Sequence, residues 1–399
     1  MKPPMDPIAA ATHADPYPYY AQLVANQPLY HDSALGAWVA SSADAVTAVL
    51  TSDLCGIRPV GEPVPAAISE SSAAEIFRHL VRMTDGDGHG PLKEAVSAAL
   101  ASVGRDQVVR QSNTSARILL AGQGQRLELD RSQDFIFGLP VHVLGSLLGI
   151  PQDRLQQTAL WMSDFVHCLA PASSPEQIKQ GNVAASHLRD MFRGLLVDQP
   201  NQPDDSLLGV LVRETQRVGY EAVDLLIANS IGFLWQGYEA TAGLIGNTLL
   251  TLATHTEVRD DVAADPSLLT HVIQEVLRYD APIQNTRRFI NCDGILAGQK
   301  MKTGDAILVV LAAANRDPAA NPNPERFDMF RRDRQIFSFG AGVHACPGDA
   351  LATAIARTGI EELLATGATL MQSHENVTYR PSANARIPLL SSVTGSSLQ

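Results

Sequence analysis

The longest regular feature of the chain is an apolar run from Leu225 to Thr256, in which Glu239 is the one acidic or basic side chain if His255 is set aside. If the run is helical throughout, it is about 48 Å long at a rise of about 1.5 Å per residue. It also contains polar residues such as Asn229 and Gln236, which make it a poor membrane span. The pattern therefore predicts a long helix through the core of the protein.

Short strands are predicted at Ala37–Ser41 and Ala306–Leu311. The turn-forming sequence Lys302–Asp305 comes directly before the second strand. Most of the remaining pattern is typical of helices, so the predicted fold class is mainly α with minor β.

Proline-rich segments interrupt the helical pattern. They are Pro59–Pro65, Pro171–Pro175, Pro200–Pro203 and Pro318–Pro324. The two ends of the chain, about residues 1–14 and the polar tail 391–399, are expected to be flexible.

The composition limits the classes of function that fit. The 399 residues are 45% hydrophobic, so a large core is available, and the formal net charge of −12 argues against a nucleic-acid partner. The segment Met1–Pro7 has no apolar or arginine-rich amphipathic stretch, so no signal peptide, transit peptide or membrane anchor is expected.

Three of the four cysteines, Cys55, Cys168 and Cys292, are far apart in sequence and form no C-x-x-C pair. Zinc-site spacing is therefore absent, and a reduced, cytoplasmic setting fits the pattern. These three are expected to be packing residues.

The fourth cysteine, Cys346, lies in the glycine-rich loop Phe339–Gly348, and a helix-like run begins at Asp349. Glycines let a backbone pass close to a flat partner and point N–H groups at a sulfur. A helix that starts directly after the cysteine would place its positive end near the thiolate and lower the thiol pKa. The pattern favours a thiolate that ligates a metal; the alternative is an inert cysteine in a glycine-rich turn.

This loop resembles the haem-binding signature of the cytochrome P450 family, the haem-thiolate monooxygenases. The resemblance extends from about residue 15 to about residue 390, so it implies one domain over residues 1–399 with the cytochrome P450 fold, a long central helix over haem b, and the soluble bacterial type. It implies that Cys346 ligates the iron, where a thiolate pushes electron density that favours O–O cleavage. The matching cofactor-binding positions of the loop are Phe339, Gly340, His344, Cys346 and Gly348.

The segment Glu239-Ala240-Thr241 resembles the family's motif of an acid followed by threonine. The resemblance implies that Glu239 delivers protons, whereas Ala240 stands where the family has its hydroxyl. Thr241 lies about 100° farther round the helix, so it is no direct replacement without a kink. Gly237 is expected to loosen the helix here. We expect a substrate hydroxyl or ordered water to complete the relay; the alternative is less ordinary chemistry, such as C–C coupling, nitration or peroxide-driven oxidation.

Several residues are expected to line the substrate pocket. Helical spacing puts Gly232, Gln236 and Ala240 on one face, with Trp235 beside them. A tryptophan there favours flat or modest-sized substrates; the alternative is core packing. The resemblance adds Gln284 and Asn384, which match substrate-contact regions, and the first two proline-rich segments, which match mobile loops over the pocket.

Glu275 and Arg278 are three residues apart and match the family's Glu-x-x-Arg pair. The resemblance implies that Arg326, in the segment Pro324–Phe327, is their partner. These three residues are expected to form a buried structural network.

Haem propionates need cations or N–H donors. The positions that match the family's propionate contacts are His89, Lys93, Arg288 and His344, with Lys93 in place of an arginine. A lysine supplies the charge but not the bidentate fork.

No flavin or nicotinamide fingerprint is present, so electrons must come from another protein, which the resemblance implies is a ferredoxin served by a reductase. The basic run Arg331, Arg332 and Arg334 is expected to dock it, the alternative being a solvated loop. The chain is expected to be a monomer that oxidises a free or carrier-bound small molecule with O2, in natural-product tailoring. The alternative class is a catalytically silent recruitment module.

Overall fold

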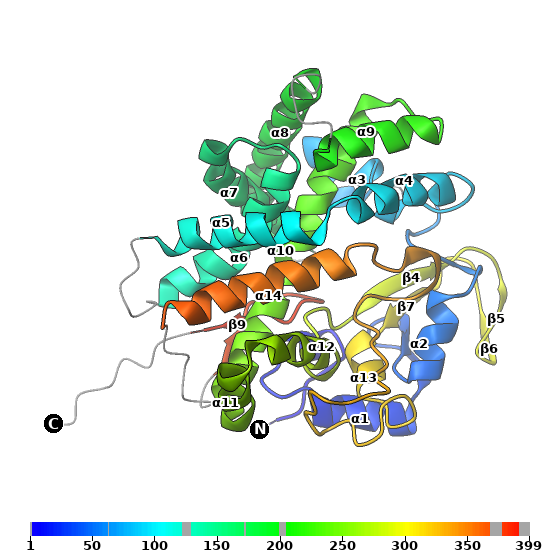
Figure 1. Cartoon of the computed structure of the whole chain (residues 1–399). Coiled ribbons are helices and arrows are strands. Elements are labelled where there is room, and N and C mark those ends of the chain that lie inside the picture. The colour runs from blue at the N-terminus through cyan, green and yellow to red at the C-terminus, as the bar shows by residue number, and fades with distance from the viewer. Residues whose placement is uncertain are drawn as a thin grey trace.

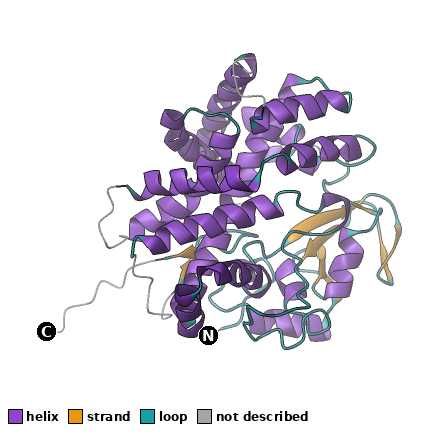
Figure 2. Ribbon diagram, viewed as in Figure 1, coloured by secondary structure: helices purple, strands orange, loops and turns teal. Residues whose placement is uncertain are grey.

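The computed structural model of the chain describes residues 2–62, 64–121, 129–170, 173–198, 205–367 and 377–390. Helices make up most of the molecule, and a small sheet lies at one side of them (Figures 1 and 2). The helices are α1 (Tyr17–Asn26), α2 (Ala43–Leu50), α3 (Ser72–Arg78), α4 (His89–Ala101), α5 (Arg105–Leu120), α6 (Leu129–Leu147), α7 (Gln152–Cys168), α8 (Pro175–Val197), α9 (Leu207–Arg217), α10 (Val223–Thr254), α11 (Thr256–Ala264), α12 (Leu269–Tyr279), α13 (Leu311–Asn315) and α14 (Asp349–Ala365). The predicted class, mainly α with minor β, is confirmed.

The long apolar run forms α10, which lies at the centre of the helical layer (Figure 1). It packs against α3, α6, α8, α12 and α14. Two of its glycines permit close approach of rigid neighbours: a Cβ at Gly243 would lie 2.9 Å from Cβ of Pro282, and one at Gly246 would lie 2.9 Å from Cδ of Pro388. The predicted core helix is thus confirmed, and its small residues explain how closely other segments approach it.

Gly237 does not loosen α10, which remains α-helical through this position. A Cβ at Gly237 would lie 2.5 Å from Cδ1 of Leu144 in α6. The expected loosening is therefore wrong, and the glycine instead allows the two helices to pack closely.

The larger sheet has the strand order β1-β2-β7-β4-β3, in which β2 and β7 are parallel and the other pairs antiparallel. Its strands are β1 (Leu29–Asp32), β2 (Ala37–Ala40), β3 (Cys55–Gly56), β4 (Thr286–Ile290) and β7 (Ala306–Val309). Both predicted strands are confirmed, as β2 and β7. Two hairpins complete the strands: β5 (Gly294–Leu296) with β6 (Gln299–Met301), and β8 (Thr378–Tyr379) with β9 (Pro388–Leu389).

The segment before α1 is anchored to the end of the described chain. The buried guanidinium of Arg386 donates hydrogen bonds to the carbonyls of Ala11, His13 and Ala14, and it pairs with Asp280 at 2.7 Å. The expectation of a flexible end over residues 1–14 is therefore wrong for the anchored residues.

The expectations for the cysteines and the proline-rich segments agree with the structure only in part. Cys168 is buried, whereas Cys292 is exposed and is not a packing residue. The segment Pro200–Pro203 and the tail 391–399 lie outside the described residues, as does the start of Pro171–Pro175. Across the described ranges, no helix combines the length and apolar character needed to cross a membrane.

Candidate active site

Cys346 sits at the end of a tight loop that leads into α14. Its backbone N–H donates to the carbonyl of Phe339 at 2.9 Å, and the N–H of Gly348 points at its sulfur, with N and Sγ 3.4 Å apart. The loop N–H groups thus close the turn and present one donor to the thiol, as the glycine-rich sequence predicts.

Two glycines with positive φ shape this loop. Gly340 has φ +69° and Gly342 has φ +68°, which is the left-handed region that L side chains rarely adopt. A Cβ at Gly342 would also lie 2.5 Å from the carbonyl oxygen of Leu50, whereas one at Gly340 would meet only His344 O at 4.0 Å. The loop can therefore fold this way against α2 only if residue 342 is glycine.

Burial raises the pKa of the Cys346 thiol, opposed by the Gly348 N–H and by the positive charges of Lys93 and Arg82. The expected lowering of the thiol pKa is therefore wrong for the protein alone. The helix that follows begins with Asp349, whose negative charge also raises the thiol pKa.

Basic side chains gather around this loop. Lys93 donates to the carbonyl of Ala345 at 2.5 Å, and the His89 ring nitrogens lie 3.3 Å from Val81 O and 3.2 Å from Val343 O. Both residues come from α4, so this helix is held against the loop by its first turns.

His344 connects the loop to Asp85. Its Nε2 lies 3.1 Å from Oδ1 of Asp85, and its ring lies 4.2 Å from that of His89. Burial alone would raise the pKa of Asp85, but the hydrogen bond with His344 and the N–H of Ile57 outweigh it and lower that pKa. Asp85 is therefore held as an anion that orients the His344 ring.

Arg288 and Arg82 complete the group of cations. Burial lowers the pKa of the Arg288 guanidinium, which donates to the carbonyl of Arg287. Arg82 lies in the short 3-10 turn Val81–Met83, with its guanidinium carbon 5.2 Å from the centroid of the Trp235 ring. The sequence did not single out Arg82 or Asp85, although an arginine between apolar neighbours just before the His89 loop is an available signal.

The middle of α10 is accessible although both flanking parts are buried. Residues 225–234 and 241–249 are buried, whereas Trp235, Gln236, Glu239 and Ala240 retain accessible surface. Arg82 lies over Trp235 in this interval, and its positive charge also acts to lower the pKa of the Cys346 thiol, so Arg82 lies near both the interval and the cysteine loop. Thr241 is only 1% exposed, whereas Ala240 retains accessible surface.

Glu239 lies beside Arg380, which follows strand β8. Burial raises the pKa of the Glu239 carboxyl, and the positive charge of Arg380 lowers it in opposition. Nη2 of Arg380 is 2.6 Å from Nε2 of His167, and its guanidinium lies over the ring of Phe137 at 4.6 Å. Among the described residues the Glu239 carboxylate has no hydrogen-bond or ion-pair partner.

Two predicted pocket residues are buried in the protein interior. Gln284 is 0% exposed, where it accepts from Tyr20 and donates to the carbonyl of Ala281. Gly232 is buried, and a Cβ there would lie 2.6 Å from Leu80. The expectation that these two line the pocket is wrong, because tertiary packing covers them.

Asn384, the other predicted contact from the end of the chain, is exposed, and its carbonyl accepts from the backbone N–H of Gln284. Trp235 packs between Phe77 and Phe165 with ring centroids 6.2 and 5.8 Å away. Its accessible surface and these contacts are compatible with both the pocket and the packing alternatives.

Glu275 and Arg278 form a fully buried ion pair with a separation of 2.6 Å. The further partners of Glu275 are Arg334 at 2.8 Å and Arg331 at 3.4 Å. Arg326 is exposed and contributes its backbone carbonyl, which accepts from Arg278. The predicted Arg326 side-chain partner is wrong, because the chain turns so that Arg334 reaches Glu275.

This network also changes the expected docking surface. The side chains of Arg331 and Arg334 are only 11% and 9% exposed, since both point inward to Glu275. Arg332 alone of the three is exposed. The expectation that all three dock a partner protein is therefore wrong for Arg331 and Arg334.

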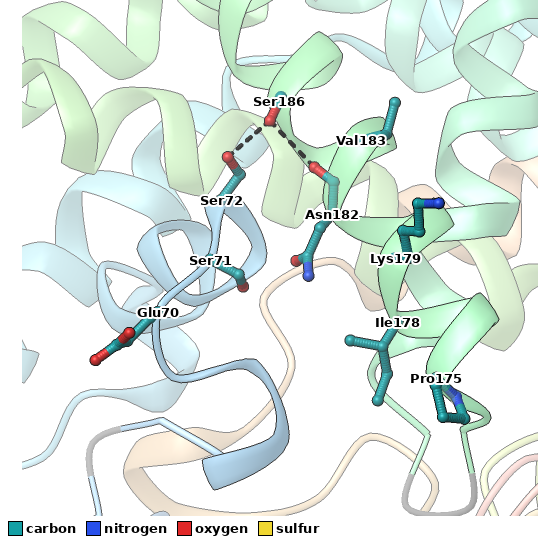
Figure 3. Close-up of a pocket in the computed structure, with 9 residues that line it drawn as sticks. All are labelled: Glu70, Ser71, Ser72, Pro175, Ile178, Lys179, Asn182, Val183 and Ser186. Carbon is teal, nitrogen blue, oxygen red and sulfur yellow. Dashed lines mark hydrogen bonds between the residues drawn. The ribbon is translucent and has the colours of Figure 1, made fainter.

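A separate groove of about 510 Å³ lies between the start of α3 and the first turns of α8 (Figure 3). Ser72 and Ser186 face each other across it, with their hydroxyl oxygens 2.7 Å apart. Its lining residues are Glu70, Ser71, Ser72, Pro175, Ile178, Lys179, Asn182, Val183 and Ser186. The groove lies close in sequence to both predicted loop segments, but it contains none of the predicted pocket residues.

Comparison with known proteins identifies the family. The family model described as Cytochrome P450 matches residues 219–378. The chain is 31% identical to 6-deoxyerythronolide B hydroxylase of Saccharopolyspora erythraea over 85% of each chain. It is 30% identical to the cytochrome P450 monooxygenase PikC of Streptomyces venezuelae over 88% of this chain and 83% of that one.

A solved structure agrees with these relatives. The crystal structure of P450BioI in complex with an acyl carrier protein ligated to hexadec-9Z-enoic acid matches with a TM-score of 0.81 and 25% identity, over 94% of this chain and 96% of that one. The chain belongs to the cytochrome P450 family. It is a haem-thiolate monooxygenase with the cytochrome P450 fold, and its cofactor is haem b.

The residues around Cys346 fit this cofactor. The Cys346 side chain is exposed, so its thiol can reach a metal, and a metal deprotonates a coordinating thiol outright. The nearby group of Lys93, His89, His344 and Arg288 offers donors for two carboxylates.

Proposed function

We propose that this P450 inserts one oxygen atom from O2 into a small organic substrate in natural-product tailoring, with electrons from a separate ferredoxin and reductase. The observation that carries the chemistry is the exposed Cys346 thiol, which receives the Gly348 N–H at the end of the glycine-rich loop. The tailoring role is supported by the similarity to two relatives named as a 6-deoxyerythronolide B hydroxylase and a PikC monooxygenase.

Each residue has a proposed role toward the cofactor. Cys346 binds the haem iron, and a haem bound through a thiolate supplies O2 activation. Phe339, Gly340 and Gly348 shape the loop around the sulfur. The propionates are held by His89, Lys93, Arg288 and His344, with Asp85 orienting the last of these.

In the middle of α10, Glu239 holds the proton that the reaction consumes. Burial raises the pKa of its carboxyl, and the positive charge of Arg380 opposes that rise. Ala240 has no hydroxyl to carry this proton onward, so a substrate hydroxyl or an ordered water completes the relay.

The electron donor docks beside the cysteine loop. Arg332 is exposed there, and Val343 of the loop is 69% exposed, so a charged and an apolar group are both available to a partner. The positive charge of Arg332 would attract an acidic ferredoxin, although the net charge of the whole chain is −12. The similarity to P450BioI, whose solved structure contains an acyl carrier protein, supports a carrier-bound form of the substrate.

The test combines spectroscopy with reconstitution. The reduced CO complex of the wild type is expected to show the thiolate-type Soret band, and Cys346→Ser is expected to lose it while Cys292→Ser keeps it. With a ferredoxin, a reductase and NADPH, product must form from a tailoring-type substrate, and omission of the ferredoxin must abolish it. A thiolate band that survives in Cys346→Ser contradicts the assigned ligand, and turnover without ferredoxin contradicts the electron route.

A further inference from the structure

Arg82 is the cation near Cys346 whose donors are not used by the protein. Lys93, His89, His344 and Arg288 each have a hydrogen bond within the protein. Among the described residues, the Arg82 guanidinium has neither a hydrogen bond nor an ion pair. Five N–H donors are thus free on one planar group.

Protein atoms surround this guanidinium without covering it. Arg82 is exposed, yet the protein lies close enough around the guanidinium that burial lowers its pKa. Both facts fit a side chain that borders a recess rather than one packed in the core. A positive charge there that no described protein group pairs is available to an anion.

The surroundings of Arg82 define one end of this recess. Its guanidinium lies over the Trp235 indole, and the indole in turn packs against Phe77 of α3 and Phe165 of α7. Trp235 belongs to the accessible interval of α10 that ends at Ala240. An anion held by Arg82 would therefore have its apolar body between this aromatic wall and the accessible residues of α10.

We propose that Arg82 binds the carboxylate of an organic acid substrate, and that the Trp235 ring holds the guanidinium in place for it. The proposal rests on the proposed monooxygenase function and narrows its substrate class to anionic molecules. Arginine suits this role because its planar fork donates to both carboxylate oxygens and stacks on an aromatic face.

A haem propionate is the other carboxylate that could reach this region. Four residues are already proposed for that purpose: His89 and Lys93 of α4, His344 of the loop and Arg288 of β4. Arg82 differs from these residues because its guanidinium lies over Trp235 of α10. This position favours the substrate as the source of the carboxylate.

The experiment measures binding to the ferric holoenzyme by titration calorimetry. The probes are two matched pairs, dodecanoate with dodecanamide and 4-butylbenzoate with 4-butylbenzamide. In the wild type we expect at least one carboxylate to bind at least about tenfold more tightly than its amide, which corresponds to about 1.4 kcal/mol. In Arg82→Gln the ratio is expected to fall to about one, and Arg82→Lys is expected to keep part of it because the charge remains.

The control variant is Arg105→Gln, which removes an exposed arginine of α5 and is expected to leave the ratio unchanged. Equal affinity for acid and amide in the wild type, in both pairs, overturns the proposal without any variant. A preference that persists in Arg82→Gln also overturns it.

Haem retention separates the two sources of carboxylate. We expect Arg82→Gln to transfer haem to apomyoglobin at the wild-type rate, whereas Arg288→Gln transfers it several-fold faster. Fast transfer from Arg82→Gln would assign Arg82 to a propionate and overturn the substrate proposal. Because none of these measurements uses an electron donor, a wrong ferredoxin or reaction type cannot produce these results.

Discussion

The charge state of Glu239 depends on its surroundings more than on its residue type. Its carboxyl lies in the middle of an apolar helix, where burial raises its pKa above the ordinary value of 4.5. The positive charge of Arg380 lowers this pKa. Arg380 reaches Glu239 only because the end of the described chain folds back over α10. A single carboxyl thus combines a proposed proton-transfer role with a cost in stability.

Glu239→Gln is predicted to be slower but more stable than the wild type at pH 8. A carboxyl with a raised folded-state pKa contributes its full stability below the unfolded-state pKa and loses it as pH rises through the folded-state pKa. The difference in unfolding temperature between Glu239→Gln and the wild type should thus be small near pH 4.5 and grow toward pH 8. Turnover should fall by about 10²-fold, the contribution of a positioned proton donor.

The measurements are thermal unfolding of the holoenzyme across this pH range and product formation at one pH. As a control, Arg380→Gln should enlarge the difference between Glu239→Gln and its parent, because the charge that lowers the Glu239 pKa is gone. A stability difference that does not depend on pH would contradict the assignment of a raised pKa.

At the scale of elements, the cysteine loop depends on its contact with α2 as well as on its own turns. Gly340 and Gly342 have nearly the same φ, so the backbone strain of a side chain is similar at both. They differ in that only Gly342 faces the end of α2, at Leu50. The loop is therefore held in place by its neighbour at one glycine and by local conformation at the other.

Gly342→Ala is predicted to reduce haem incorporation much more than Gly340→Ala. At residue 340 the cost is the left-handed backbone alone, roughly 1–2 kcal/mol. At residue 342 a Cβ would meet the carbonyl oxygen of Leu50 at 2.5 Å, so the loop or α2 must also shift. The ratio of Soret to protein absorbance in purified protein measures the effect, and equal loss in both variants would show that the contact with α2 has no influence.

At the scale of the whole molecule, buried ion pairs join segments that are distant in sequence. Glu275 in α12 holds Arg334, 59 residues later, and Asp280 holds Arg386, 106 residues later. The first pair fixes the segment before the cysteine loop, and the second ties the region before α1 to the end of the described chain. Loss of one partner removes a charge-assisted hydrogen bond from a buried group.

Arg334→Ala is predicted to destabilise the holoenzyme by about 1.5–3 kcal/mol, since Glu275 loses one charge-assisted hydrogen bond but keeps Arg278 and Arg331. Arg326→Ala should change stability by about 0.5 kcal/mol or less, because that side chain is exposed and only its carbonyl takes part in the network. Urea unfolding of the two variants provides the measurement. Equal destabilisation would restore Arg326 as a side-chain partner of Glu275.

The sequence by itself determined the family, the mainly α class, the long core helix, the two strands and the helix after the cysteine loop. These depend on local patterns: apolar runs, β-prone residues, and glycines at fixed spacing around Cys346. The presence of alanine at residue 240 was equally visible, because a missing hydroxyl needs no tertiary structure to be noticed.

Only the tertiary structure decided which distant groups meet. It placed Arg334 rather than Arg326 on Glu275, buried Gln284 beneath Tyr20, and brought Arg82 over Trp235. Side chains such as these have no local signal, because their partners lie tens to hundreds of residues away and the same residue type can be buried, paired or exposed. Their roles follow from the packing of α10 against the elements around it.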